Sequence, residues 1–169
     1  MSEKLYFTYN EIHQTVKTLA EEIINSPFEP ELIVAIGTGG FIPARILKTY
    51  INKPILTVGL RYYDNDNKPM SEPQKIQWID EVEKKLSGKK ILLVDEVDDT
   101  RTTLAFCLRE LRTHKPEEIA VAVLHTKMKK KSDHFPESIR YTFTGLELED
   151  KWICYPWDAE DIYRHDQMK

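Results

Sequence analysis

A buried strand that ends in a cluster of carboxylates is the feature that most constrains this chain. The apolar run from Ile91 to Val94 is flanked by lysines and is typical of a strand buried on both faces of a sheet. Four acidic residues follow directly, and an apolar pattern with helical spacing begins at Leu104. The order of strand, polar loop and helix predicts a ligand site, because ligands bind at the carboxyl ends of strands in open α/β sheets.

The four acids, Asp95, Glu96, Asp98 and Asp99, repel one another unless hydroxyl groups, a cation or backbone amides compensate their charge. The segment Thr100–Thr103 supplies hydroxyls, and a helix that starts here also supplies unpaired N–H groups that favour a phosphate. One short loop therefore offers acceptors for a polyol and donors for a phosphate. A sugar phosphate satisfies both requirements.

A second connection between strand and helix is rich in glycine. The apolar run at residues 32–36 predicts a buried strand, and three glycines occur among residues 37–40. Pro43 then lies near the first turn of an expected helix, where proline is favoured. Glycines let the backbone approach a ligand closely or adopt positive φ. This connection is therefore either a second phosphate-binding loop or a tight turn needed for packing.

The first helix is predicted from its capping pattern. Thr8 and Glu11 have the spacing of a capping box, and the helix is expected to continue to Asn25, before Pro27. The apolar residues that we expect on its buried face are Ile12, Val16, Leu19, Ala20, Ile23 and Ile24.

Further strands are predicted at residues 55–60, 118–125 and 140–144, and a short final helix from Ala159. Strands that alternate with helices predict a parallel sheet with helices on both faces. The whole chain, residues 1–169, is expected to form a single α/β domain.

Residues 61–75 are polar, contain two prolines and show no periodicity. A long polar stretch inside a domain is typical of a lid over an active site or of a mobile surface loop, and the sequence favours neither. Residues 76–86 fit a short helix or a mixture of strand and helix.

Four lysines, Lys127, Lys129, Lys130 and Lys131, follow the strand expected at residues 118–125. A lysine run alone is usually a solvated face. Here it follows the carboxyl end of a strand, so we expect one lysine to point into the crevice.

Composition excludes several classes of protein. The formal net charge of −4 gives no support to a general nucleic-acid binder. No apolar run approaches the ~18 residues of a membrane span, and the charged N-terminus is unlike a signal peptide. Cys107 and Cys154 stand far apart without a CxxC motif, so we expect reduced thiols in a cytoplasmic protein. The sequence also lacks a P-loop, a GxGxxG motif after a strand, and histidines at metal-ligand spacing.

Four segments together resemble one known family. LLVDEVDDTRTT resembles the 5-phosphoribosyl-1-pyrophosphate (PRPP) loop of type I phosphoribosyltransferases, and AIGTGGFIPARIL resembles their pyrophosphate loop. DKWICYPWDAEDI is similar to the C-terminal hood of the xanthine and hypoxanthine-guanine branch, both bacterial and fungal-type. YDNDN occurs where their flexible loop begins. The resemblance implies a parallel sheet flanked by helices, a flexible loop at about residues 61–75, and a small hood from N-terminal residues and about 140–169.

The resemblance also implies residue roles around PRPP. Asp95 and Glu96 would accept hydrogen bonds from the ribose hydroxyls and stabilise positive charge on the ring. Asp99 would act as general acid/base at the purine N7. The residues implied for the 5-phosphate are Asp99, Thr100, Arg101, Thr102 and Thr103, and those implied for pyrophosphate are Thr38, Gly39 and Gly40.

For the base, the resemblance implies that Lys127 donates to the purine O6, that Trp152 stacks on the ring and that Ile153 packs beside it. It implies Mg²⁺ as the cofactor, with Glu96 and Asp158 as candidate ligands, because that ion prefers hard oxygen donors. Two positions depart from the family pattern. Relatives often carry Arg or Lys where this chain has Thr38, and glycine at or beside Arg101 and Thr102.

The activity implied is purine salvage: PRPP and hypoxanthine, guanine or xanthine give a nucleoside 5′-monophosphate and pyrophosphate. The partners implied are these small molecules and further copies of the chain in a homodimer or homotetramer, with no nucleic acid. Two alternatives are a PRPP-sensing regulator of the same fold that binds RNA or DNA, and an enzyme specific for a pyrimidine. The presence of Asp99, Lys127 and Trp152 favours the purine enzyme, and the sequence does not rank the three purines.

Overall fold

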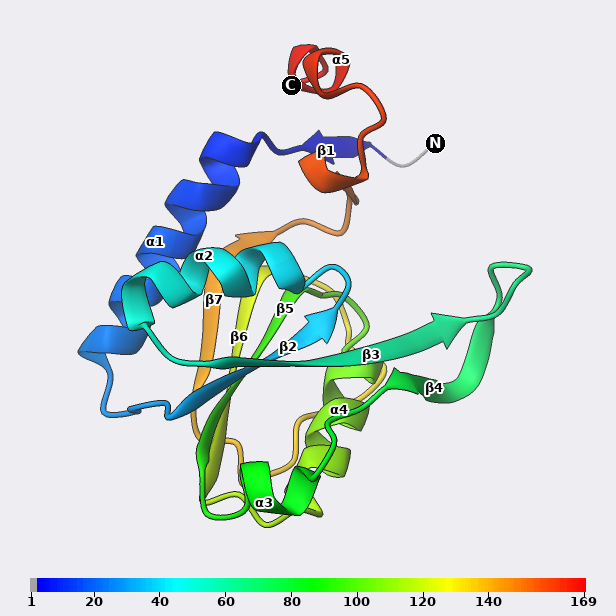
Figure 1. The fold of residues 1–169 in the computed structure, drawn as a ribbon. Coiled ribbons are helices and arrows are strands. Elements are labelled where there is room, and N and C mark those ends of the chain that lie inside the picture. Colours follow the sequence, from blue (N-terminus) through cyan, green and yellow to red (C-terminus); the bar gives the residue numbers. More distant parts are fainter. Residues whose placement is uncertain (1–2) are drawn as a thin grey trace.

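A six-stranded sheet with helices on both faces forms the body of the protein (Figure 1). The structure, a computed structural model, describes residues 3–169. Its elements are, in chain order, β1 (Lys4–Tyr6), α1 (Tyr9–Asn25), β2 (Leu32–Gly37), α2 (Phe41–Ile51), β3 (Ile55–Tyr63), β4 (Pro69–Gln77), α3 (Val82–Leu86), β5 (Lys90–Asp98), α4 (Thr102–Arg112), β6 (Glu118–Lys127), β7 (Thr142–Leu148), β8 (Trp152–Cys154), a 3-10 helix η1 (Pro156–Asp158) and α5 (Ile162–Gln167).

The strand order in the sheet is β4-β3-β2-β5-β6-β7, and every neighbouring pair is parallel except β3 with β4. The middle strands β2, β5 and β6 are nearly continuous runs of buried residues, as expected where both faces of a sheet are covered. The predicted parallel α/β sheet is confirmed. Strand β5 continues to Asp98, so Asp95 and Glu96 belong to the strand and the loop after it is shorter than expected.

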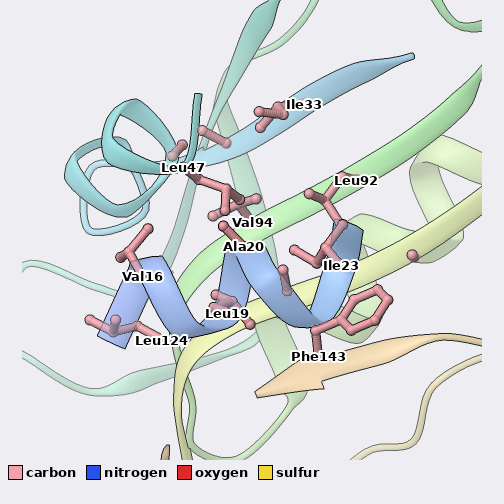
Figure 2. Close-up of a cluster of buried hydrophobic side chains, with 14 of the residues drawn as sticks. Val16, Leu19, Ala20, Ile23, Ile33, Leu47, Leu92, Val94, Leu124 and Phe143 are labelled. Carbon is pink, nitrogen blue, oxygen red and sulfur yellow. The ribbon is translucent and has the colours of Figure 1, made fainter. Parts of the chain in front are cut away.

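Two hydrophobic clusters cover the two faces of the sheet. On one face, residues of α1 and α2 pack against Ile33, Val94 and Leu124 of the strands, as Figure 2 shows. On the other face, residues of α3 and α4 pack against the opposite side of the same strands. The prediction of helices on both faces is confirmed.

Helix α1 begins at the predicted capping box. The Thr8 hydroxyl accepts a hydrogen bond from the Glu11 N–H at 3.3 Å, and the Glu11 carboxylate accepts one from the Thr8 N–H at 2.9 Å. The expected stripe residues are buried against the sheet except Ile24, which is 59% exposed. The prediction for Ile24 was wrong because this residue lies about 100° around the helix from the buried Ile23, outside the face that meets the sheet.

The segment predicted as a polar loop at 61–75 is a β-hairpin, which corrects the sequence-based expectation. Strand β3 continues to Tyr63 and pairs antiparallel with β4, and the hairpin extends away from the body of the sheet (Figure 1). The Asp64 carboxylate closes the turn by accepting from the N–H groups of Asp66 and Lys68, both at 2.9 Å. Strand β4 lies at the sheet edge and is almost wholly exposed, so no apolar alternation marks it in the sequence. Helix α3 occupies part of the unassigned region 76–86.

Residues from the two ends of the chain form a second, two-stranded sheet. Strands β1 and β8 are parallel, and Leu5 pairs with Ile153. The His165 ring in α5 bonds the Phe7 carbonyl through Nε2 at 2.9 Å, which adds the last helix to this group. The final helix begins at Ile162 rather than Ala159, and β7 starts two residues later and ends four residues later than predicted. Among the described residues, no helix has both the length and the apolar character of a membrane span.

Candidate active site

The loops after β2 and β5 line one cavity of about 370 Å³ at the carboxyl ends of the strands. The predicted site residues on its wall are Thr38, Gly39, Asp95, Glu96, Asp99, Thr100, Arg101 and Thr103. The hairpin adds Leu60, Tyr62 and Tyr63, which the sequence analysis did not identify. Gly40, Thr102, Lys127, Trp152, Ile153 and Asp158 do not line this cavity. The cavity thus joins the two loops that were each interpreted as phosphate-binding.

The glycine loop brings the backbone of residues 37–40 against strand β5. A Cβ atom on Gly40 would lie 2.6 Å from the Ile36 carbonyl oxygen and 2.8 Å from that of Val94, so only glycine fits there. A Cβ on Gly39 would overlap the Glu96 carboxylate. None of the loop's three glycines has positive φ. The glycines serve close approach, and the predicted alternative of positive φ is not used.

Asp95 and Glu96 form an acidic pair at the centre of the cavity wall. Asp95 is buried, and its Oδ1 accepts a hydrogen bond from the Glu96 N–H at 2.9 Å. Burial, and then the neighbouring Glu96 charge, raise the pKa of Asp95 well above its ordinary value. A pair of this kind gains stability when a ligand brings hydroxyl donors or positive charge, because both compensate the repulsion.

The buried Asp98 stabilises the acidic loop through contacts with Arg101 and Lys131, a role that its sequence position did not predict. It is 2% exposed and accepts a bond from Arg101 Nη2 at 2.6 Å. Lys131 Nζ lies 3.6 Å from the Asp98 carboxylate and donates to the carbonyl oxygens of Asp98, Asp99 and Lys127 at 2.7 to 2.9 Å. Lys131 therefore ties the acidic loop to the end of β6. The spacing of two between Lys127, Lys129 and Lys131, directly after a strand end, was the sequence signal for these contacts.

Asp99 stands between two further lysines. Lys127, buried at the end of β6, approaches Asp99 Oδ2 with its Nζ at 3.2 Å, and Lys129 Nζ lies 2.8 Å from Asp99 Oδ1. Burial alone raises the pKa of Asp99, but the two ammonium groups outweigh it and lower that pKa overall. Asp99 is thus an ionised carboxylate. Three lysines of the run contact the acidic loop, although none of the three lines the cavity.

Trp152 and Ile153 lie in β8 of the terminal sheet, outside the cavity. Trp152 is 62% exposed, and its backbone N–H donates to the Glu3 carbonyl oxygen at 3.1 Å. An exposed indole on a hydrogen-bonded strand is a flat surface held in place by its backbone. This arrangement suits stacking on a planar ligand.

Tyr155 connects the terminal sheet to the acidic strand. Its hydroxyl donates to the Glu96 carbonyl oxygen at 3.3 Å, and His125 Nδ1 lies 2.9 Å from the same hydroxyl. The His125 Nδ1 is therefore the donor, and burial lowers the pKa of His125 to about 4. Burial, and after it the negative charges of Glu96, Asp95 and Asp158, raise the pKa of Tyr155.

Within residues 3–169, no three acidic, histidine or cysteine side chains converge as a preformed metal site. Mg²⁺ is usually held by one or two carboxylates together with substrate phosphates and waters. The carboxylates of Glu96, on the cavity wall, and of Asp158, at the end of η1, are hard oxygen donors. This donor set fits an ion that arrives with a phosphorylated substrate.

Comparison with known proteins gives a consistent result. Residues 8–161 match the phosphoribosyl transferase domain. The chain is 41% identical to the hypoxanthine-guanine phosphoribosyltransferase of Schizosaccharomyces pombe, over 96% of this chain and 93% of that protein. It is 37% identical to xanthine phosphoribosyltransferase 1 of Saccharomyces cerevisiae, over 99% and 95%.

The chain belongs to the phosphoribosyl transferase family. The crystal structure of a Neisseria gonorrhoeae protein with bound ppGpp superposes with a TM-score of 0.92, at 46% identity, over 99% of this chain and 96% of that one. The resemblance to the xanthine and hypoxanthine-guanine branch is therefore confirmed, as is the type I fold.

The departure from the family pattern at Arg101 has a backbone explanation. Arg101 has φ of +73°, a conformation that favours glycine, and it immediately precedes α4. In this chain an arginine keeps that backbone and adds the ion pair with Asp98, as well as a contact over the Phe135 ring at 4.1 Å. The arginine side chain therefore compensates for the conformational cost of the position.

Proposed function

We propose that this phosphoribosyltransferase is a purine salvage enzyme, which joins the 5-phosphoribosyl group of PRPP to N9 of hypoxanthine, guanine or xanthine. The relatives named for these bases are 37 to 41% identical over almost the whole chain, which supports the proposal. The observation that carries it is the single cavity that the acidic pair, the threonine loop and the glycine loop line together. Each of these three groups suits a different part of PRPP.

The phosphoribosyl side of the site consists of the residues on that cavity. Asp95 and Glu96 accept hydrogen bonds from the ribose hydroxyls, and their charge stabilises the ring as the bond from C1 to pyrophosphate breaks. The segment Asp99–Thr103 binds the 5-phosphate with N–H groups and hydroxyls at the start of α4. The backbone of Thr38, Gly39 and Gly40 holds pyrophosphate, so no cationic side chain is needed at position 38.

The purine side of the site consists of Lys127, Trp152, Ile153 and Asp99. The base stacks on Trp152 beside Ile153, and the Lys127 ammonium donates to O6. Adenine carries an amino donor at that position, so Lys127 excludes it. As N9 bonds to C1, the purine loses a proton, and the ionised Asp99 accepts it at N7.

The cofactor implied is Mg²⁺, which Glu96 and Asp158 would hold together with substrate oxygens. When bound, the ion supplies screening of the charge on the departing pyrophosphate. All other steps depend on side chains and backbone groups of the chain. The enzyme acts as a homodimer or homotetramer in the cytoplasm, which sedimentation of the purified protein and cell fractionation would test.

The same site binds ppGpp, which combines guanine, a ribose and two pyrophosphate groups. The Neisseria gonorrhoeae protein crystallised with this nucleotide shares 46% of its sequence with the chain. Because ppGpp presents the groups of both substrates, it competes with PRPP. A rise in the apparent KM for PRPP with added ppGpp, at unchanged kcat, is the expected result.

Turnover with Mg-PRPP and five bases tests the proposal. We expect monophosphate formation with guanine, hypoxanthine or xanthine, and none with adenine or uracil. Failure with every 6-oxopurine, together with tight PRPP binding and association with RNA or DNA, would instead support the regulator alternative. Turnover of uracil would support a pyrimidine enzyme.

A further inference from the structure

Four charged side chains form a closed cluster beside the proposed purine site: Lys127, Lys129, Asp99 and Asp150. Each ammonium group contacts both carboxylates. Lys129 Nζ lies 2.8 Å from Asp99 Oδ1 and 3.1 Å from Asp150 Oδ1. Lys127 Nζ lies 3.2 Å from Asp99 Oδ2 and 3.7 Å from Asp150 Oδ1. The cluster thus joins the acidic loop, the end of β6 and the turn between β7 and β8.

The two lysines bind different oxygens of Asp99, and this has a consequence for purine binding. In the proposed function, Lys127 turns to the purine O6, which takes one cation away from both carboxylates. Its departure frees only Asp99 Oδ2, the oxygen then available to N7. Asp99 Oδ1 remains 2.8 Å from Lys129 Nζ, so the carboxylate keeps a counter-ion.

The second carboxylate of the cluster extends this effect to the stacking surface. Asp150 lies two residues before Trp152, in the turn that leads into β8. When Lys127 leaves, Asp150 retains its contact with Lys129 at 3.1 Å. Lys129 therefore connects Asp99, the proposed proton acceptor, to the turn before β8, the strand that carries Trp152.

We propose that Lys129 is a positioning residue for phosphoribosyl transfer: it holds the carboxylates of Asp99 and Asp150 while Lys127 is released to the purine. The inference rests on the proposed function for its role in turnover, but the ion pairs themselves are independent of it. The pairing with Asp99 raises the pKa of Lys129, so the lysine stays charged throughout.

The neighbouring lysines provide controls. Lys130, next in sequence, is exposed and makes no ion pair in the described part of the chain. Lys131 donates hydrogen bonds to backbone carbonyl oxygens, two in the acidic loop and one on Lys127. Around Asp99, the charged and titratable groups from packed elements are therefore Lys127, Lys129, Lys131, Asp150 and Tyr155.

The first test follows the Asp99 carboxyl by carbon NMR during a pH titration of the free protein. We expect Lys129→Met to raise the pKa of Asp99 by about one unit, since it loses a cation within hydrogen-bond distance. Lys129→Arg and Lys130→Met should leave it near the wild-type value. Asp150→Asn should leave it unchanged or lower it, because an acid rather than a cation is removed. An equal pKa in Lys129→Met and Lys130→Met overturns the proposal.

The second test separates the kinetic constants of the two substrates. Lys129→Met should lower kcat/KM for the purine about 5- to 10-fold and move the acid limb of its pH profile upward, with the KM for PRPP unchanged. Lys129→Arg should restore most of the activity. If Lys129→Met changes only the KM for PRPP, the positioning role is wrong. If the wild type turns over no purine, the proposed function fails, while the titration still decides the ion pairing.

Discussion

The phosphoribosyl side and the purine side of the site are built in different ways. The phosphoribosyl side lies at the ends of β2 and β5, where Gly39 and Gly40 leave no room for another atom. The purine side depends on charged side chains and on the exposed Trp152, which is carried by a sheet formed from both chain ends. One side is fixed by the backbone of the main sheet and the other by contacts between distant segments. Substitutions should therefore affect PRPP and purine separately.

The largest effect is expected from Asp99→Asn, because Asp99 touches both sides. The amide cannot accept the purine proton, so kcat should fall ~100-fold or more. PRPP affinity, measured by calorimetry, should remain, because the acidic pair and the glycine loop are untouched. Unchanged turnover would remove Asp99 from proton transfer.

Trp152→Ala tests the independence of the purine side. Base stacking on an aromatic ring contributes ~1–3 kcal/mol, so the KM for the purine should rise about 10- to 100-fold. The indole is largely exposed, so the melting temperature should change little. Steady-state kinetics with each substrate varied in turn would check this. A matched rise in the KM for PRPP would show that the two sides are coupled.

The dependence of stability on acid pH tests the buried contact between His125 and Tyr155, which links the terminal sheet to β5. His125 beneath Tyr155 has a pKa of about 4, and an unfolded histidine has a pKa of ~6.5. Between pH ~6.5 and pH 4, the His125 imidazole takes up a proton in the unfolded state but not in the folded state. The free energy of unfolding therefore falls by ~2–3 kcal/mol as the pH falls through this range. Urea melts of the wild type and His125→Gln over this range should differ in slope. Parallel slopes would mean that His125 is protonated in the folded protein.

Gly39→Ala tests the rigidity of the phosphoribosyl side and should give the smallest effect. The added methyl displaces the Glu96 carboxylate, a flexible side chain, so the fold should survive while PRPP affinity falls about 10-fold. Gly40→Ala is the contrasting variant. Its methyl meets the carbonyl oxygens of Ile36 and Val94, so it should destabilise the fold by ~1–3 kcal/mol. Equal PRPP affinity in Gly39→Ala and wild type would contradict this account.

The sequence predicts the phosphoribosyl side better than the purine side, for a physical reason. Strand β5, its acids and α4 are contiguous, and the capping box of α1 is complete within four residues. Such signals are local. Tyr62 and Tyr63 line the cavity because they lie on the β3–β4 hairpin at the edge of the sheet. The sequence did not predict this hairpin, because the exposed strand β4 has no apolar alternation.

The contacts of the lysine run also depend on tertiary structure that the local sequence does not encode. In sequence, the strand end before the run predicts that one lysine points into the crevice, but it does not assign separate partners to Lys127, Lys129 and Lys131. Their roles arise because β6 ends beside the acidic loop, so three ammonium groups meet Asp98 and Asp99. The pairing of β1 with β8 also joins residues about 150 positions apart, which no local pattern encodes.

The β1–β8 pairing has a consequence for how the protein is made. A ribosome releases β1 first and β8 nearly last, so a growing chain already contains β2, β5 and the loops that follow them well before its two ends can meet. The residues proposed for the sugar donor are therefore synthesised before the strand that carries Trp152. For the same reason, an affinity tag fused to either end sits next to the base-binding surface, and cleavable tags are the safer choice for kinetic work.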